Sequence, residues 1–70
     1  GYTKQALEDI NKSLILFPEN SYAYRNRALI YIELKKFEKA CIDIEKAIEL
    51  GYKEKYGSDI DMIKIENCKK

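Results

Sequence analysis

Residues 21–54 read SYAYRNRALIYIELKKFEKACIDIEKAIELGYKE, and this stretch decides the fold. Its apolar residues recur at steps of three and four, the spacing that lines one side of an α-helix. Asn20 or Ser21 can cap a helix over 21–34, and the same periodicity continues over 37–50. The stretch therefore predicts two helices joined by a tight reversal.

Two further helices are expected on either side of this stretch. One runs from about Thr3 to Leu16, where the apolar spacing is again that of a helix. The other runs from about Ser58 to Lys69; its isoleucines also suit a strand, but a lone strand would have no partner. Ser58 followed by Asp61 resembles a capping arrangement. The prediction is an all-α fold of four antiparallel helices.

Composition and length narrow the range of possible functions. A chain of 70 residues has room for one core, so residues 1–70 are expected to form a single domain. A net charge of +1 is too small to favour nucleic acid or an anionic membrane, and no apolar run has the length of a membrane span. Histidine, the commonest acid-base residue and metal ligand, is absent. We expect no enzyme activity, metal or cofactor, while the compartment stays open.

The chain contains an internal repeat. Sliding it along itself by 34 residues aligns five identical pairs within eleven positions, where chance gives about one. These pairs are Ala6 with Ala40, Asp9 with Asp43, Ile10 with Ile44, Lys12 with Lys46, and Leu16 with Leu50. A period of about 34 is typical of helix-turn-helix solenoids.

The stretch from Ser21 to Glu54 resembles one whole repeat of the tetratricopeptide repeat family. The resemblance rests on Tyr24-Arg25-Asn26-Arg27-Ala28, Tyr31, Leu34, Phe37, Ala40, Asp43, Ala47, Ile48 and Leu50. Residues 1–20 resemble the second helix of a preceding repeat, with Pro18 in the family's usual place. The segment 55–70 matches poorly and is expected to be a C-terminal capping helix. The resemblance thus implies an antiparallel solenoid of about one and a half repeats plus a cap, similar to the closing fragment of bacterial members.

The resemblance also implies a binding face on the second helix. In the family this face lines a concave groove that holds an extended peptide, and here it carries Tyr22, Arg25, Asn26, Leu29 and Glu33. In chaperone-adaptor members an asparagine at the Asn26 position belongs to a clamp for a terminal carboxylate. Asp59 and Asp61 stand where such a clamp needs basic residues, so a complete clamp is not expected. The alternative is that Asn26 bonds to neighbouring backbone.

Two pairs of residues are expected to serve the scaffold. Arg27 should pair with Asp9 or Asp43, because a charge between helices is tolerated only with a partner. Cys41 and Cys68 each lie about 14 to 15 Å from the turn between the last two helices, at about 1.5 Å per residue. They are therefore candidates for a disulfide in an oxidising compartment and for buried thiols in a reducing one.

Two functions remain open from the sequence. The first is a protein-protein interaction module that binds an extended peptide or a partner helix on the concave face. The second is structural, a cap of a longer solenoid or a self-association element with no ligand of its own. The apolar stripe of Ala6, Ile10 and Ser13 lacks the helix that it would contact in a full repeat, so a homodimer through this stripe is a further expectation.

Overall fold

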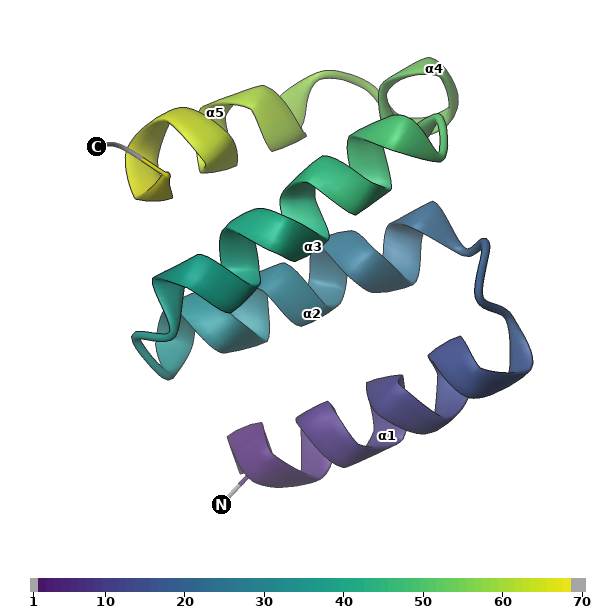
Figure 1. Ribbon diagram of the computed structural model, residues 1–70, viewed down its shortest axis with the longest axis vertical. Coiled ribbons are helices and arrows are strands. Elements are labelled where there is room, and N and C mark those ends of the chain that lie inside the picture. Colours follow the sequence, from purple (N-terminus) through teal and green to yellow (C-terminus); the bar gives the residue numbers. More distant parts are fainter. Residues whose placement is uncertain (1, 69–70) are drawn as a thin grey trace.

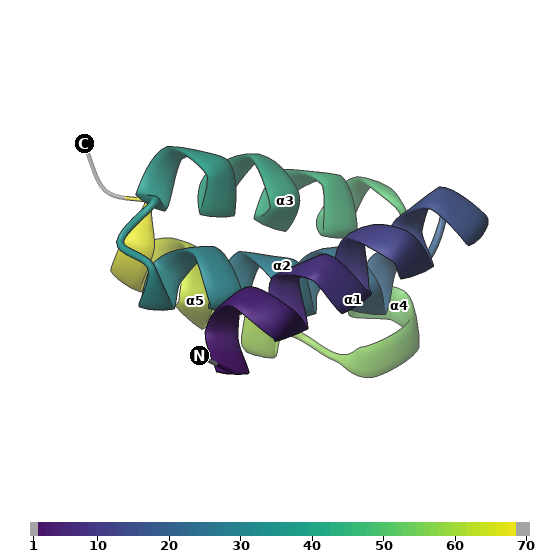
Figure 2. The same ribbon diagram turned by 90° about the horizontal axis from the view of Figure 1, so that it is seen from below.

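The computed structural model describes residues 2–68, which fold into α-helices joined by short turns and contain no strand. The helices of this part of the chain are α1 (Tyr2–Leu16), α2 (Ser21–Glu33), α3 (Phe37–Glu49), α4 (Tyr52–Tyr56) and α5 (Asp59–Asn67). In Figure 1 the long helices lie side by side, and successive ones run in opposite directions. Seen from below in Figure 2, α3 lies on one side of α2 and α5. The all-α helical-repeat fold predicted from the sequence is confirmed.

The turns that bound α2 have clear local causes. Asn20 caps the helix, because its Oδ1 accepts a hydrogen bond from the N–H of Ala23 at 3.1 Å. At the other end Lys35 takes a left-handed conformation with φ of 60°. This lets the N–H of Lys36 donate to the carbonyl of Tyr31 at 2.8 Å. The reversal into α3 is as tight as the sequence predicts.

The prediction of four helices missed α4. Gly51 ends α3 with φ of 93°, and the chain then makes one helical turn before Gly57, where φ is 109°. Tyr52 is only 2% exposed and anchors this turn in the core, while the N–H of Lys55 donates to the carbonyl of Gly51 at 3.2 Å. A single turn between two glycines leaves no periodic signal in the sequence. The expected start of the capping segment, residue 55, falls inside α4.

The last helix is shorter than predicted within the described residues. It runs over Asp59–Asn67 instead of Ser58 to Lys69, and Lys69 lies outside the residues that the structure describes. The Ser58 side chain makes no capping hydrogen bond, so that part of the prediction was wrong. The Ser58 carbonyl instead accepts from the N–H of Asp61 at 3.0 Å. Asp59 and Asp61 lie in the first turn of α5, where the positive end of the helix dipole stabilises their negative charge.

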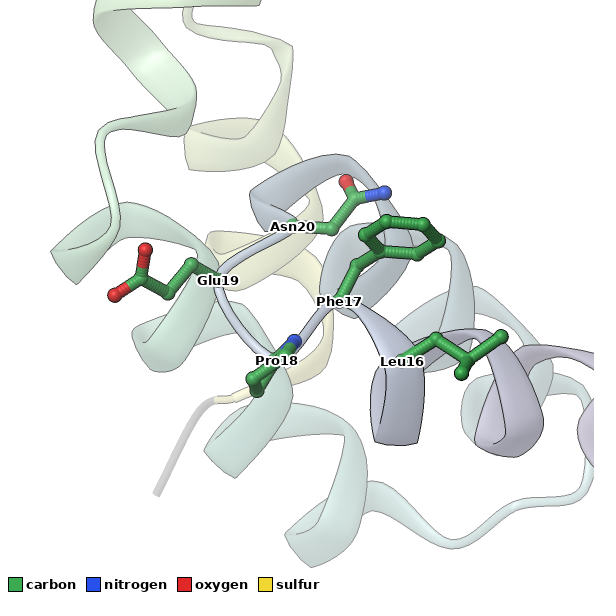
Figure 3. Close-up of a pocket in the computed structure, with 5 residues that line it drawn as sticks. All are labelled: Leu16, Phe17, Pro18, Glu19 and Asn20. Atoms are coloured by element: carbon green, nitrogen blue, oxygen red, sulfur yellow. The ribbon is translucent and has the colours of Figure 1, made fainter.

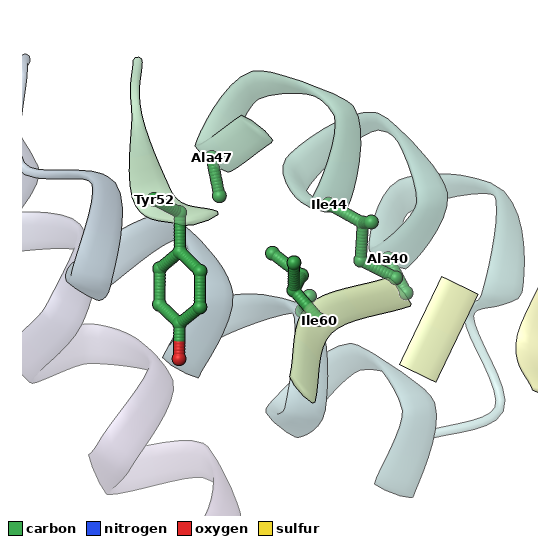
Figure 4. Close-up of a cluster of buried hydrophobic side chains, with 6 residues drawn as sticks. Ala40, Ile44, Ala47, Tyr52 and Ile60 are labelled. Atoms are coloured by element: carbon green, nitrogen blue, oxygen red, sulfur yellow. The ribbon is translucent and has the colours of Figure 1, made fainter. Parts of the chain in front are cut away.

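The core lies between α2, α3 and the α4–α5 segment. Its buried residues are at most 2% exposed: Ala28, Ala40, Ile44, Ala47, Tyr52 and Ile60. Figure 4 labels the five of them that come from α3, α4 and α5. The alanines let α2 and α3 approach closely, as expected from their small side chains. Isoleucine and tyrosine fill the space that remains on the α5 side. Burial of this kind contributes about 25 cal/mol per Å² of apolar surface.

Within residues 2–68, no helix is both long enough and apolar enough to cross a bilayer.

Candidate functional site

The five residues predicted for the concave face share one side of α2, and we call them the α2 stripe. Tyr22 and Leu29 have exposed fractions of 43% and 37%, Arg25 and Asn26 are half-buried, and Glu33 is exposed. The Arg25 guanidinium donates from Nη1 to Oδ1 of Asn26 at 3.1 Å and lies 5.9 Å from the centre of the Tyr22 ring. Asn26 is thus held by a side chain, whereas the alternative from the sequence was a backbone bond.

An ion pair connects the α2 stripe to α5. Arg25 Nη2 lies 3.0 Å from Oδ2 of Asp59, and the Tyr52 hydroxyl donates to Oδ1 of the same carboxylate at 3.1 Å. Partial burial of Asp59 opposes ionisation, but the hydrogen bonds from Arg25 and Tyr52 outweigh it and lower the pKa of Asp59. Burial, together with the hydrogen bond to Asp59, raises the pKa of Tyr52. The result is a fixed arrangement of one positive and one negative group.

Three tyrosines form a cluster at one end of this face. The Tyr56 ring lies 5.1 Å from the rings of both Tyr22 and Tyr52, and the Tyr22 and Tyr52 rings stack at 6.3 Å. Such pairs hold aromatic rings in fixed orientations. Tyr22 and Tyr56 are both exposed at the surface. The cluster therefore presents an ordered aromatic edge to solvent.

The sequence placed Asp59 near the Asn26 face, but it did not predict the ion pair of Asp59 with Arg25 or the contacts of Tyr52 and Tyr56 with Tyr22. A signal for two of them was present in the repeat, because a shift of 34 residues maps Tyr22 onto Tyr56 and Arg25 onto Asp59. Equivalent positions of successive repeats lie side by side in a solenoid. A shift by one repeat therefore identifies residues that are in contact as well as residues that occupy equivalent positions.

The other end of the α2 stripe is linked to α1. The Thr3 hydroxyl donates to Oε2 of Glu33 at 2.7 Å. Leu29 lies between the two linked ends and supplies the exposed apolar centre. Among residues 2–68, no three acidic or cysteine side chains gather in a metal-binding arrangement. The face is suited to contact by apolar and polar side chains of a ligand.

A groove of about 480 Å³ lies between α1 and α2. Its walls are Ala6, Asp9, Ile10 and Ser13 from one side, and Asn20, Tyr22, Ala23, Asn26 and Ile30 from the other. Two members of the α2 stripe, Tyr22 and Asn26, therefore border it. Of the stripe of Ala6, Ile10 and Ser13, Ala6 is exposed and the other two are half-buried.

A second hollow, of about 410 Å³, surrounds the loop between these helices. Its walls are Leu16, Phe17, Pro18, Glu19 and Asn20. Figure 3 shows the Glu19 carboxylate pointing away from the side chains of Leu16 and Phe17. Leu16 and Phe17 are 73% and 62% exposed, so this loop adds apolar surface next to the groove.

Arg27 pairs with Asp43. Its Nε and Nη2 atoms donate to the two Asp43 oxygens, each at 2.8 Å, and Nη1 donates to Oδ1 of Asn11 at 3.0 Å. The hydrogen bond to Asp43 raises the pKa of Arg27, against the effect of partial burial. Asp9, the alternative partner, instead accepts from Nε2 of Gln5 at 3.0 Å. Asp9 lines the groove on another side of α1, which is why Arg27 does not reach it.

Cys41 and Cys68 are joined by a disulfide in the structure, with their Cα atoms 5.8 Å apart. Cys41 lies in α3, and Cys68 directly follows α5. An ion pair of 2.7 Å between Lys64 and Glu45 links the same two helices. The C-terminal helix is therefore attached to α3 by covalent and ionic contacts.

Comparison with known proteins gives two matches. Residues 21–53 match the family model of the tetratricopeptide repeat. The chain is also 32% identical, over 69 residues, to sperm-associated antigen 1 of Rattus norvegicus, and the alignment covers 94% of this chain. The chain spans only 8% of the length of that relative. No solved structure matches the chain significantly.

Proposed function

We propose that the chain is a protein-protein interaction module whose ligand lies across the α2 stripe. The support is that residues 21–53 match the family model of the tetratricopeptide repeat. Repeats of this family generally mediate contacts between proteins. The α2 stripe lies between α1 and α5. Its Glu33 accepts a hydrogen bond from Thr3 of α1, and its Arg25 pairs with Asp59 of α5. An extended peptide or a partner helix that lies there contacts three helices at once.

The observation that carries this proposal is the ordering of the α2 stripe around exposed apolar side chains. Arg25 is held by Asp59 and Asn26, so its orientation is set before a ligand arrives. Preorganised polar groups reduce the entropy cost of binding, and exposed Leu29 and Tyr22 supply apolar area. Hot spots of protein interfaces commonly combine aromatic side chains and arginine.

The charge of the face limits the chemistry of the ligand. Asp59 neutralises Arg25, and the nearby Asp61 carboxylate is itself paired with Lys53 at 3.1 Å, so the face offers no free positive group of its own at Arg25. Because Arg25 is already paired, a terminal carboxylate would find no free partner there, and we expect a ligand that offers apolar and neutral polar side chains. This agrees with the incomplete carboxylate clamp expected from the sequence.

The test is binding of the full chain to an array of peptides 15 residues long. Saturable hits are expected, and Leu29→Ser is expected to weaken them by about fivefold because it removes the apolar centre of the stripe. Ile42→Ser is the matched control, since Ile42 is 68% exposed on α3, away from the stripe. The absence of hits above background, or equal losses in both variants, would contradict the proposal.

A second candidate function is structural. The α4–α5 segment covers the core with Tyr52 and Ile60, which are 2% and 0% exposed, as a cap would. At the opposite side, Ala6 and Ile10 line an open groove that a second copy can cover. This candidate predicts no peptide ligand and an apparent mass that rises with concentration in analytical ultracentrifugation. A constant monomer mass up to millimolar concentration would exclude the homodimer.

A further inference from the structure

Helix α5 depends on other helices for its order. It has nine residues, of which Ile60 is the single buried one, and Ile63 is half-buried against the core. Isolated helices of this length are marginal in water, so attachments to the rest of the chain must hold it. Near its C-terminal end Lys64 pairs with Glu45 of α3, but these side chains are 43% and 58% exposed. Exposed ion pairs contribute little stability, so this end needs a firmer attachment.

The disulfide between Cys41 and Cys68 is that attachment, and a reagent can reach it. Both cysteines are half-buried, and their Cα atoms lie 5.8 Å apart. They line a hollow of about 540 Å³, whose other walls include Phe37, Ile42 and Asn67. A small thiol can therefore approach the sulfur atoms from solvent.

The other end of α5 orders the α2 stripe. Asp59 is the first residue of α5, and its carboxylate accepts hydrogen bonds from Arg25 at 3.0 Å and from the Tyr52 hydroxyl at 3.1 Å. Within residues 2–68 Arg25 Nε is buried without a hydrogen-bond partner, so the guanidinium depends on its bonds to Asn26 and Asp59. Movement of α5 would leave Arg25 with Asn26 alone. One short helix thus connects the disulfide to the orientation of Arg25.

We propose that thiol–disulfide exchange at Cys41 and Cys68 regulates the α2 stripe. In the oxidised chain the bond holds α5 in place, and Asp59 fixes Arg25. In the reduced chain α5 opens more often, each opening releases Arg25 from Asp59, and a ligand meets a less ordered surface. The proposal rests on the assignment of the α2 stripe as the binding face and names the regulation of that face.

The exchange takes a dithiol as its co-reactant. One thiolate of the dithiol attacks a sulfur atom of the disulfide, which breaks the bond between the cysteines and forms a mixed disulfide. The second thiolate of the dithiol then displaces the attached cysteine. Two electrons and two protons pass to Cys41 and Cys68, which become thiols, and the dithiol becomes a cyclic disulfide.

Hydrogen exchange followed by NMR tests the coupling without a ligand. The air-oxidised full chain is compared with the same chain in dithiothreitol. Reduction is expected to speed amide exchange over residues 60–67 by about tenfold, because α5 then opens locally. Exchange over residues 6–13 should keep its rate, since α1 buries only Leu14 and opens independently of α5. The Arg25 Nε–H signal should move on reduction.

Three variants show whether the signal passes through Asp59. In Asp59→Asn the Arg25 signal should no longer respond to dithiothreitol, because Arg25 has already lost this partner. Asp61→Asn is the matched control and should keep the response, since Asp61 pairs with Lys53. The double variant Cys41→Ala with Cys68→Ala should resemble the reduced parent and ignore the reagent.

The effect on binding is measured with the array peptide whose affinity depends on Leu29. Reduction is expected to weaken this peptide by about threefold, because a preordered surface binds more tightly. By linkage, the bound peptide should make the disulfide harder to reduce by the same factor. An array without hits contradicts the proposed function, whereas the exchange rates and the Arg25 signal test the coupling by themselves.

Four outcomes would overturn the regulation. The first two are exchange in α5 that ignores the dithiol and an Arg25 signal that does not move. The third is equal acceleration of exchange in α1, which would mean that reduction destabilises the whole chain. The fourth is equal peptide affinity in the two states. Two free thiols in the air-oxidised chain, detected by alkylation and mass spectrometry, would also refute it.

Discussion

Arg27 links α2 to α3 through the Asp43 carboxylate. Its guanidinium matches the Asp43 carboxylate with two bonds, and Asp43 is almost completely buried. A buried pair of this kind gains little net stability over apolar residues of similar volume, but removal of one partner leaves an uncompensated charge. The pair therefore fixes which surfaces of the helices meet.

Arg27→Met is expected to lower the free energy of unfolding by about 3 kcal/mol, because Asp43 loses its partner. The double variant Arg27→Met with Asp43→Leu should lose less, since no buried charge remains. Urea unfolding followed by circular dichroism measures both. A single variant as stable as the parent, or a double variant less stable than the single one, would show that the pair is not buried as described.

Tyr52→Phe is expected to lower the free energy of unfolding by about 1 kcal/mol at neutral pH, through loss of the hydrogen bond to Asp59. Because folding raises the pKa of Tyr52 above its usual 10.0, the contribution of the hydroxyl is full below pH 10 and is lost as the pH rises through the raised value. The difference between parent and variant should therefore shrink above about pH 10.

The control for this prediction is Tyr56→Phe, because Tyr56 is 51% exposed. Urea unfolding at several pH values should give a nearly constant difference for this control. On the acid side the contribution of Asp59 is present above its usual pKa of 3.8 and is lost as the pH falls through its lowered value. A Tyr52→Phe difference that does not change with pH would contradict the bond to Asp59.

At the scale of the helices, small side chains set the spacing. Ala28 and Ala40 are both 0% exposed and pack within the core between α2 and α3. By repeat symmetry Ala6 occupies in α1 the position that Ala40 occupies in α3, but it lies in an open groove. The same residue type thus has two different environments in one chain.

Ala40→Leu is expected to cost about 1 to 3 kcal/mol, because added volume at a fully packed contact forces the helices apart. Ala6→Leu is the matched control and should change stability by less than about 0.5 kcal/mol, since its side chain enters solvent. Thermal unfolding of both variants provides the comparison. Equal effects at the two positions would mean that the groove is closed in solution.

The sequence was sufficient to predict the long helices, but it was not sufficient to predict some of the contacts between them. Apolar periodicity located α1, α2 and α3 to within about one residue at each end. It missed α4, because one turn between Gly51 and Gly57 has no period and is stabilised by burial of Tyr52, a tertiary effect. Local patterns report such tertiary contacts poorly.

In the candidate site, too, the positions on one helix could be predicted and the bonds between helices could not. Helical spacing places the residues of the α2 stripe on one side of α2. It does not predict their hydrogen bonds to Asp59 and Thr3, which lie on other helices. Asp9 and Asp43 are equivalent in the repeat, so the sequence left both as partners of Arg27. The side of the helix decides between them: Asp43 faces Arg27 from α3, whereas on α1 it is Asn11 that reaches Arg27, and Asp9 lines the groove instead.

At the scale of the whole molecule, the disulfide closes the C-terminal half. Its reduction, or Cys41→Ala with Cys68→Ala, is expected to lower the free energy of unfolding by about 3 to 4 kcal/mol, because the bond joins residues that are 27 positions apart in the sequence. Unfolding with and without a dithiol reductant measures this. The double alanine variant is the control and should not respond to reductant. A parent stability that ignores the reductant would mean that the cysteines are not bonded in solution.

The position of Cys68 also decides how the molecule carries mechanical load. A pull on the chain beyond α5 is transmitted through the sulfur atoms directly to α3, so the enclosed residues 42–67 remain slack. At about 3.3 to 3.6 Å per residue, this shielded segment withholds about 90 Å of contour length. Tension between the two ends therefore acts first on α1, which buries only Leu14, whereas α2 buries three residues and α3 four.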